Sequence, residues 1–193
     1  NRENYRLISD IDASETSEWN NGSGFKPLFN TSESVSDYID SNGELKSGYP
    51  NVFSGVFDGN DKTISGLYID RSTRVSLITT SVQSKFKDMT IADSTLKSSG
   101  KTGIFGDSIN VNMSNISVEN STVEGGEFTG TVATGFINYN STGFTVSDIS
   151  VSGVNVSSNS DKVGGVVSSI AVIRGSGTST VSDVSVSGSV SGS

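Results

Sequence analysis

A short apolar motif recurs along the chain, and it restricts the fold more than any other feature of the sequence. Each copy has apolar residues at its first, fourth and sixth positions, as in Val181-Ser182-Asp183-Val184-Ser185-Val186. Five copies begin at Ile64, Phe86, Met113, Val146 and Val181, with starts 22, 27, 33 and 35 residues apart. A fixed unit separated by insertions of varying length is typical of a solenoid. We therefore expect equivalent residues to stack in inward-facing columns, one of which contains Leu67, Met89, Ile116, Ile149 and Val184.

Further columns follow in the later part of each repeat. The alignment groups Val75 with Thr102, Thr129 and Val163, Ile78 with Phe105, Val132 and Val166, and Val82 with Ile109, Phe136 and Ile170. Each repeat thus contains about three short segments rich in β-branched residues, with the period of two that favours strands. The crossover rule favours a right-handed path. The predicted fold is all-β, a right-handed parallel β-helix (β-solenoid) of about five coils with three strands per coil.

The composition agrees with such a fold. Hydrophobic residues make up 32% of the chain, which is low for a compact globule. Ser, Thr and Asn fill the positions between the apolar ones, and in a strand these positions face the opposite side. Because each coil of a solenoid buries its inner face against its neighbours, little apolar content is needed per coil.

The sequence divides into a capping segment, 1–52, and the coils, 53–193, which we expect to form one continuous domain. The capping segment lacks the repeat, and a repeat stack needs bulky residues over its first layer. Its last part, 31–52, is polar, and we expect a loop there with one helical turn around Val35 to Ile39. The aromatic residues expected to cover the first coil are Tyr5, Trp19, Phe25 and Phe29.

Charge and missing residue types exclude several function classes. The net charge of −8 argues against nucleic acid, because neutralising phosphates needs Lys and Arg. With neither Cys nor His, the chain lacks thiolate ligands and the commonest general base, and we expect no cofactor. No apolar run approaches the ~18 residues of a membrane span, so we expect no membrane insertion. The chain begins with Asn1 and not with Met, from which we expect either a processed product or a chain shortened for expression.

Three stretches resemble a known family. YRLISDIDAS from Tyr5, FKPLF from Phe25 and FSGVFDGNDKTISGLYI from Phe53 are similar to the opening of GLUG-motif proteins, with a turn expected at Asp58-Gly59-Asn60-Asp61. KTGIFG at 101–106 and KVGGVV at 162–167 resemble the repeats of that family. The resemblance implies a secreted or cell-surface β-solenoid, often part of a large adhesin-like protein. It implies no catalytic residues.

One repeat position carries Asp88, Asn115, Asp148 and Asp183, which a solenoid would stack in a column. Asp148 and Asp183 on adjacent coils are the candidate metal ligands, because hard cations take carboxylate oxygens. The alternative, which we prefer, is a bend whose Asx side chains bond their own backbone.

Paired carboxylates would favour a glycoside hydrolase, and parallel β-helices also host polysaccharide lyases. Asp107, Glu119, Glu124 and Glu127 are the candidates, but they form no motif. We therefore predict no catalytic residues, no enzymatic activity and no turnover of common polysaccharides.

A loop that the shorter repeats lack supplies the candidate ligand-binding residues. Tyr139 and Phe144 lie in or beside the insertion 138–144, and Arg174 lies in the corresponding insertion of the next repeat. Aromatic loops on a rigid scaffold are typical recognition sites, whereas the alternative is that Phe144 packs on the next strand. Asn-x-Ser/Thr sequons, which permit glycosylation, stand at Asn21, Asn30, Asn112, Asn115, Asn120, Asn140 and Asn155.

We interpret the chain as an extracellular or cell-surface module with a structural or adhesive role in an appendage or large surface protein. The alternative is a carbohydrate-binding or carbohydrate-processing solenoid such as a viral tail-spike-like module. The stretch 181–193 resembles the first strands of another coil and leaves an edge open to pairing. We therefore expect identical subunits or further coils at the C-terminal end, with glycans or a host or cell surface as other partners.

Overall fold

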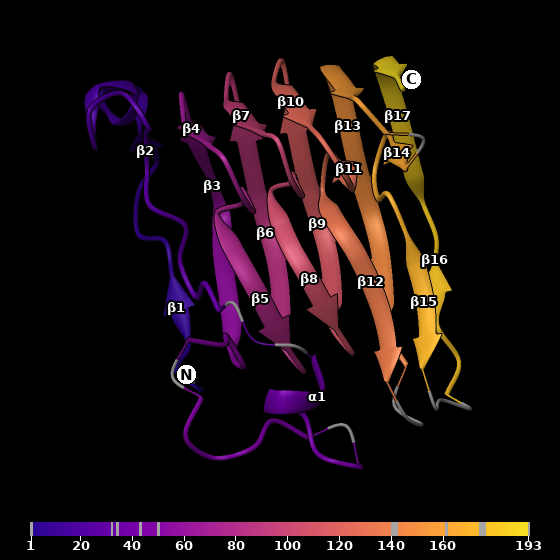
Figure 1. The fold of residues 1–193 in the computed structure, drawn as a ribbon. Coiled ribbons are helices and arrows are strands. Elements are labelled where there is room, and N and C mark those ends of the chain that lie inside the picture. The colour runs from indigo at the N-terminus through magenta and orange to yellow at the C-terminus, as the bar shows by residue number, and fades with distance from the viewer. Residues whose placement is uncertain are drawn as a thin grey trace.

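The computed structural model describes residues 2–31, 33, 35–42, 44–49, 51–139, 143–160, 162–173 and 177–192. The fold is all-β, with 56% strand and 4% helix, and the strands pair in parallel. Figure 1 shows the strands side by side in chain order, from the indigo N-terminal segment to the yellow C-terminal strands. None of the helices in the described residues is long and apolar enough to cross a membrane.

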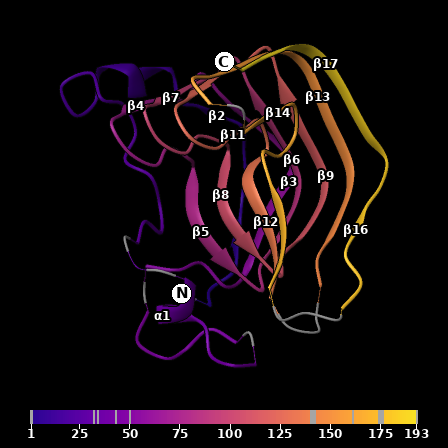
Figure 2. The ribbon, with the colours of Figure 1, turned by 45° about the vertical axis from the view of Figure 1, so that its right-hand side comes forward.

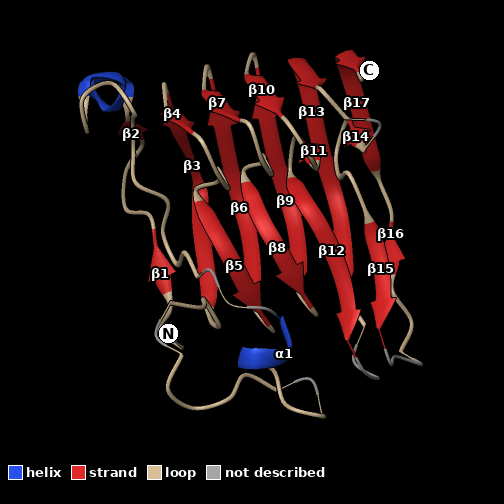
Figure 3. Cartoon of the chain, in the orientation of Figure 1, coloured by secondary structure: helices blue, strands red, loops and turns tan. Residues whose placement is uncertain are grey.

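The long sheet contains most of the strands. Its members are β1 (Tyr5–Arg6), β2 (Ile11–Asp12), β3 (Val56–Ser65), β4 (Tyr68–Arg71), β6 (Lys85–Ala92), β7 (Thr95–Ser98), β9 (Asn112–Glu119), β10 (Thr122–Gly125), β13 (Thr145–Ser158), β16 (Thr180–Val181) and β17 (Val184–Ser191). A second sheet contains β5 (Ile78–Val82), β8 (Phe105–Ile109), β12 (Ala133–Tyr139) and β15 (Ile170–Ile173). A short pair contains β11 (Thr129–Gly130) and β14 (Val163–Gly164), and the helical turns are η1 (Ser14–Glu18) and α1 (Val35–Tyr38), drawn in blue in Figure 3.

The register confirms the main stacking prediction over four of the five copies. Met89 pairs with Ile116, Ile116 with Ile149 and Ile149 with Val184, so equivalent residues follow one another from strand to strand. Met89, Ile116 and Ile149 are at most 2% exposed. Val184 is 38% exposed because β17 pairs with β13 on one side and no described strand lies on its other side. The parallel strands in this register are consistent with a β-solenoid.

The prediction for the first copy is wrong. Phe86 pairs with Phe57 and not with Ile64, which pairs instead with Ile91. Leu67 is buried, but it lies outside the column of Met89. The cause is a register shift between Asp58 and Lys62, where the segment expected to be a turn forms a bulge inside β3.

The later columns are present only in part. Val75, Thr102 and Thr129 pair as predicted, and so does Ile78 with Phe105. Between β8 and β12, however, the register shifts by one residue: Phe105 pairs with Ala133 and not with Val132, and Ile109 pairs with Ile137 and not with Phe136. Between β12 and β15 the prediction is correct again, because Phe136 pairs with Ile170. Because side chains alternate along a strand, a shift of one residue moves them to the opposite face.

The residues predicted to form one column, Val82, Ile109 and Phe136, belong to two different hydrophobic clusters. Phe136 belongs to the central core, which also includes Phe86 and Phe105, whose ring centroids are 4.3 Å apart. Figure 2 shows the sheet of β5, β8 and β12 facing the sheet of β3, β6 and β9 across this core. Val82 and Ile109 face the other way, toward a second cluster with Tyr38, Ile39, Leu45 and Val52. The helical turn predicted around Val35 is present as α1, and its segment covers the outer face of β5 and β8.

The N-terminal segment forms hydrogen bonds with the backbone groups at the first edge of the sheet, through two short strands and several side chains. β1 and β2 pair with β3 over two residues each. Between and beyond them, side-chain oxygens accept hydrogen bonds from backbone N–H groups: Asn4 from Val56, Asp10 from Thr63, and Thr16 from Tyr68, each at 2.9 Å. Short strands and side-chain bonds of this kind reduce pairing with another chain.

The aromatic residues of this segment cover the first strands only in part. The Phe29 ring lies 5.2 Å from that of Phe53, and Tyr5 lies 6.1 Å from the same ring. Trp19, by contrast, is 48% exposed; it directly follows η1, the blue turn at the upper left of Figure 3.

Candidate functional site

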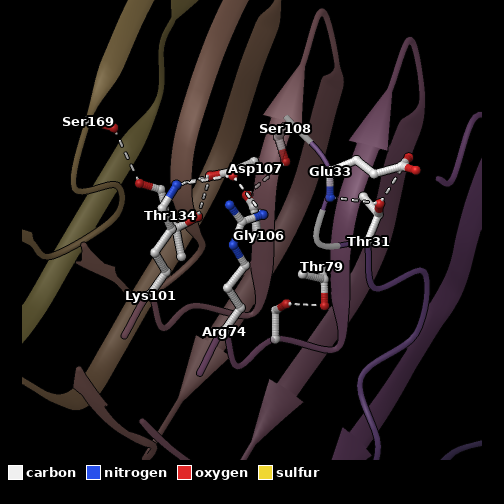
Figure 4. Close-up of polar contacts among 11 residues, drawn as sticks. Thr31, Glu33, Arg74, Thr79, Lys101, Gly106, Asp107, Ser108, Thr134 and Ser169 are labelled. Atoms are coloured by element: carbon white, nitrogen blue, oxygen red, sulfur yellow. Dashed lines mark hydrogen bonds and ion pairs between the residues drawn. The ribbon is translucent and has the colours of Figure 1, made fainter. Parts of the chain in front are cut away.

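A buried carboxylate with two cationic partners is the most prominent polar cluster of the fold. Asp107, in the middle of β8, is 8% exposed. Its two oxygens each lie 3.1 Å from Lys101 Nζ, and Oδ2 lies 3.3 Å from an Arg74 guanidinium nitrogen. Thr134 donates its hydroxyl to Asp107 Oδ1 at 3.2 Å. Figure 4 shows the three partners converging on the carboxylate from different passes of the chain.

The register explains why these side chains meet. Arg74 precedes Val75, Lys101 precedes Thr102, and these two following residues form a parallel bridge. The next residues at this position are Phe128 and Lys162, and both lysines lie over the Phe128 ring, at 5.0 and 4.4 Å from its centroid. Asp107 was among the predicted acidic candidates, but its cationic partners Arg74 and Lys101 were not predicted. The signal was present, because the alignment of Val75 with Thr102 already placed the two basic residues at one repeat position.

The cluster is suited to stability and not to acid–base chemistry. Glycoside hydrolysis needs a second carboxyl group across the bond. The other acidic candidates lie elsewhere: Glu119 in β9, Glu124 in β10 and Glu127 in the loop after it. Glu124 Oε2 instead pairs with Lys97 Nζ at 3.2 Å on the exposed side of the long sheet. The structure thus joins Asp107 to cations and not to these carboxylates.

Removing the buried carboxylate is expected to destabilise the fold. Asp107→Ala leaves Arg74 and Lys101 without their anion, and we expect a loss of about 2 kcal/mol of unfolding free energy, below the usual figure for a buried pair because both cations are partly exposed. Glu124→Ala, which breaks an exposed pair, should change stability by less than about 1 kcal/mol. Urea denaturation of the two variants measures the difference, and equal losses would contradict this account of the cluster.

The four residues of the column proposed as a metal site have the backbone conformation of a bend. Asp88, Asn115, Asp148 and Asp183 all have positive φ, between 52° and 56°. Asn and Asp tolerate this left-handed conformation better than other residues with a side chain. Asn115 donates to Asp88 at 3.1 Å. Among the described residues no group of three acidic side chains is placed to hold a metal ion, so nothing in the geometry favours Asp148 and Asp183 as ligands over bend residues.

Lys87 joins two carboxylates of neighbouring strands. Its Nζ lies 2.9 Å from Asp58 and 2.7 Å from Asp88. The hydrogen bond from Lys87 lowers the pKa of Asp58, and bonds from Lys87 and Asn115 lower the pKa of Asp88. The hydrogen bonds to both carboxylates raise the pKa of Lys87 in return.

These shifts predict a loss of stability in acid. A carboxyl group whose pKa is lower in the folded state stabilises the fold above its unfolded value, here 3.8, and this contribution disappears as the pH falls through the folded pKa. We expect the melting temperature of Lys87→Met to lie below that of the unaltered chain at pH 6, and the two to converge by about pH 2. If the difference between the two melting temperatures stayed constant from pH 6 to pH 2, the two carboxyl groups would not be the source of the stability that is lost in acid.

The two aromatic residues predicted to bind a ligand are buried. Tyr139 is 7% exposed, and its backbone exchanges two hydrogen bonds with the Asn110 side chain, at 2.7 and 2.8 Å. Phe144 is 2% exposed, with its ring 5.5 Å from that of Phe136, so it packs on the next strand. Arg174 lies outside the described residues.

The sequons among the described residues lie at the surface, where an attached glycan would extend into solvent. Their asparagines are all exposed, whereas Asn110 and Asn138, which stand in no sequon, are buried. Asn115 is the least suited of them, because its amide nitrogen already donates to Asp88. The exposed sequon residues are Asn21, Asn30, Asn112, Asn115, Asn120 and Asn155, and Asn140 lies outside the described residues.

Comparison with known proteins gives one partial likeness. No family model and no solved structure matches the chain. Over 72 residues, 36% of this chain, the sequence is 43% identical to Halomucin of Haloquadratum walsbyi (strain DSM 16790 / HBSQ001). The matched part rounds to 0% of that protein's own length. The chain is therefore similar, over about a third of its residues, to a very small part of a halomucin.

Proposed function

We propose that this chain is an extracellular, non-enzymatic module of the GLUG-motif type, with a structural or adhesive role in a surface appendage or a large surface protein. Its coils form a right-handed parallel β-helix of about five coils with three strands each. The observation that carries the proposal is the continuous parallel register from Met89 through Ile116 and Ile149 to Val184, with Thr90, Ser117 and Ser150 on the opposite face. A rigid rod with hydroxyl-covered faces suits a scaffold.

The likeness to a halomucin supports the extracellular placement, and the exposed sequons are compatible with it. The buried aromatics Tyr139 and Phe144 give no support to the tail-spike-like alternative, which requires side chains that a glycan can reach. Asp107, neutralised by two cations, gives none to hydrolysis.

The C-terminal end supports the proposed partner. β17 has eight residues without Lys or Pro, the residues that commonly protect an edge strand. It pairs with β13 alone among the described strands, and Val181, Val186 and Val190 are between 47% and 49% exposed. We infer that further coils or an identical subunit cover this end in the assembled protein.

Two measurements test the proposal. Immunogold labelling of cells that make the natural protein should place it outside the cell envelope, and intracellular labelling would overturn the placement. Incubation with a panel of polysaccharides should release no new reducing ends. Reproducible cleavage that Asp107→Asn abolishes would overturn the non-enzymatic role.

A further inference from the structure

The turn after η1 combines the only tryptophan of the chain with a sequon, in the stretch WNNGS at 19–23. The backbone folds tightly here, because Gly22 and Gly24 both donate their N–H groups to the Trp19 carbonyl oxygen, at 3.1 and 3.0 Å. All three residues of 20–22 have positive φ, between 53° and 81°, a conformation that Asn and Gly tolerate best. The tryptophan and the sequon asparagine therefore belong to one compact turn.

The strand β4 holds this turn in place. Phe25 donates its backbone N–H to the Tyr68 carbonyl oxygen at 2.8 Å, and Asp70 donates its own to the Ser23 carbonyl oxygen at 3.1 Å. The Arg71 guanidinium donates to the Phe25 carbonyl oxygen at 3.2 Å. The turn is thus fixed to the sheet, and a group attached to it would be held in a defined place.

The amide of Asn21 is open to modification. Asn21 is exposed, and its side chain forms no hydrogen bond with any described residue. Asn20, which stands in no sequon, instead donates its amide to the Gly24 carbonyl oxygen at 2.8 Å. A Cβ atom placed at Gly22 would meet no heavy atom within 4 Å apart from its chain neighbours, so the tip of the turn is surrounded by open space.

Other sequons lack this combination. Asn112 and Asn155 accept hydrogen bonds through their amide oxygens, and Asn115 donates through its amide nitrogen. Asn120 is exposed and its amide forms no hydrogen bond with the described residues, but the stretch 113–127 around it contains no aromatic residue.

Trp19 presents an aromatic face beside the open amide. It is 48% exposed, and the Phe25 ring, 6.3 Å away between centroids, packs on it at a tilt. An indole has a large apolar surface, which gains free energy when another group covers it. The faces of a sugar ring carry apolar C–H groups that are suited to this contact.

We propose that Asn21 carries an N-linked glycan whose first sugar packs on the exposed face of Trp19. The inference rests on the extracellular placement proposed above, since such glycans are attached during export. In the attachment step, Asn21 Nδ2 attacks C1 of an oligosaccharide linked to a lipid phosphate. The C1–O bond breaks, the lipid phosphate leaves with the bonding electrons, and an amide proton passes to a base of the transferase.

Glycopeptide mass spectrometry of the protein from cells that make it naturally tests the attachment. The peptide that contains 19–23 should carry a glycan on Asn21. A chain that immunogold labelling places outside the cell and whose Asn21 is bare would overturn this inference and leave the proposed function intact. A bare chain inside the cell would overturn both.

A double-mutant cycle tests the contact with Trp19, in protein secreted by a mammalian cell line that attaches N-acetylglucosamine-linked glycans. Ser23→Ala removes the sequon and should lower the melting temperature by about 2–4 °C. In the background of Trp19→Ala the same substitution should change nothing. The same variants from bacteria that attach no glycan give the effect of each substitution alone, which is subtracted. Equal losses in the two backgrounds, or no loss in either, would refute the contact.

The sequon at Asn120 provides the matched control. Thr122→Ala removes it, and the resulting change in melting temperature should be the same with Trp19 and with Trp19→Ala, because no aromatic residue of 113–127 can receive the sugar. If this sequon coupled to Trp19 as strongly as that of Asn21, the effect would not depend on the turn, and the proposal would be wrong.

Discussion

Ile116→Asp is expected to prevent stable folding. Ile116 is fully buried, and its strand neighbours in the column, Met89 and Ile149, are 2% and 1% exposed. Ile116 belongs to a cluster of buried apolar side chains, so the new carboxylate would be buried among groups that can neither pair with it nor solvate it. Such a charge costs more than about 4 kcal/mol, a large part of the total stability of a domain.

The neighbouring residue provides the control. Ser117 lies on the opposite face of β9, is only partly buried, and pairs with Thr90 and Ser150. Ser117→Asp places the same charge one residue away and should lower stability by less than about 1 kcal/mol. Circular dichroism melts of the two variants decide the matter: similar melting temperatures would show that this strand does not distinguish an inner from an outer face.

The strand register is predictable from the sequence where insertions lie between copies of the apolar motif, and it is not predictable where an insertion lies inside a copy. Between β6, β9, β13 and β17 the insertions fall outside the apolar motif, so aligning the motif also aligns the strands. In β3 the extra residues fall inside the motif, at the bulge between Asp58 and Lys62. An alignment that keeps the apolar spacing fixed therefore places Ile64 opposite Phe86, where the structure has Phe57.

The face of a strand is harder to predict when both faces are buried. All residues of β5 and β8 are buried, since one face meets the central core and the other meets the segment around α1. Val82 and Ile109 are apolar like core residues, but they contact Tyr38 and Val52 outside the coil. Composition does not distinguish these two environments. Which face of β5 and β8 points to the central core and which to the outside becomes clear only from the position of 35–52, and long-range packing sets that position.

The polar cluster was predictable in part. Asp107 stands out as an acidic residue within an apolar strand, but its partners become visible only through the register that brings Arg74 and Lys101 together. The apolar cavity beside η1, lined by Leu7, Ile64 and Leu77 among others, was not predictable. It depends on how the irregular N-terminal segment curls at η1, and no repeat in the sequence describes that path.

Gly106→Ala is expected to be the second severe change, for a reason of backbone proximity. A Cβ atom at Gly106 would lie 2.0 Å from the carbonyl oxygen of Thr79 and 2.7 Å from its carbonyl carbon, on the adjacent strand β5. Backbone cannot rotate away as a side-chain end can, so β8 and β5 would have to separate. The separation would also displace Asp107, the next residue, from its cations. We expect a loss of about 3 kcal/mol or more, the upper part of the range for overpacking.

Gly135→Ala is the matched control for this prediction. Gly135 is also a buried glycine in the same sheet, and it pairs with Asp107, the residue that follows Gly106. A Cβ atom there would meet the hydroxyl of Ser169 at 3.1 Å and its backbone oxygen only at 3.8 Å. Because a serine side chain can rotate, this variant should lose less than about 1 kcal/mol. Urea denaturation of both variants measures the two losses. If Gly135→Ala proves as costly as Gly106→Ala, burial alone sets the cost, and the contact between Gly106 and the Thr79 carbonyl is not what requires glycine.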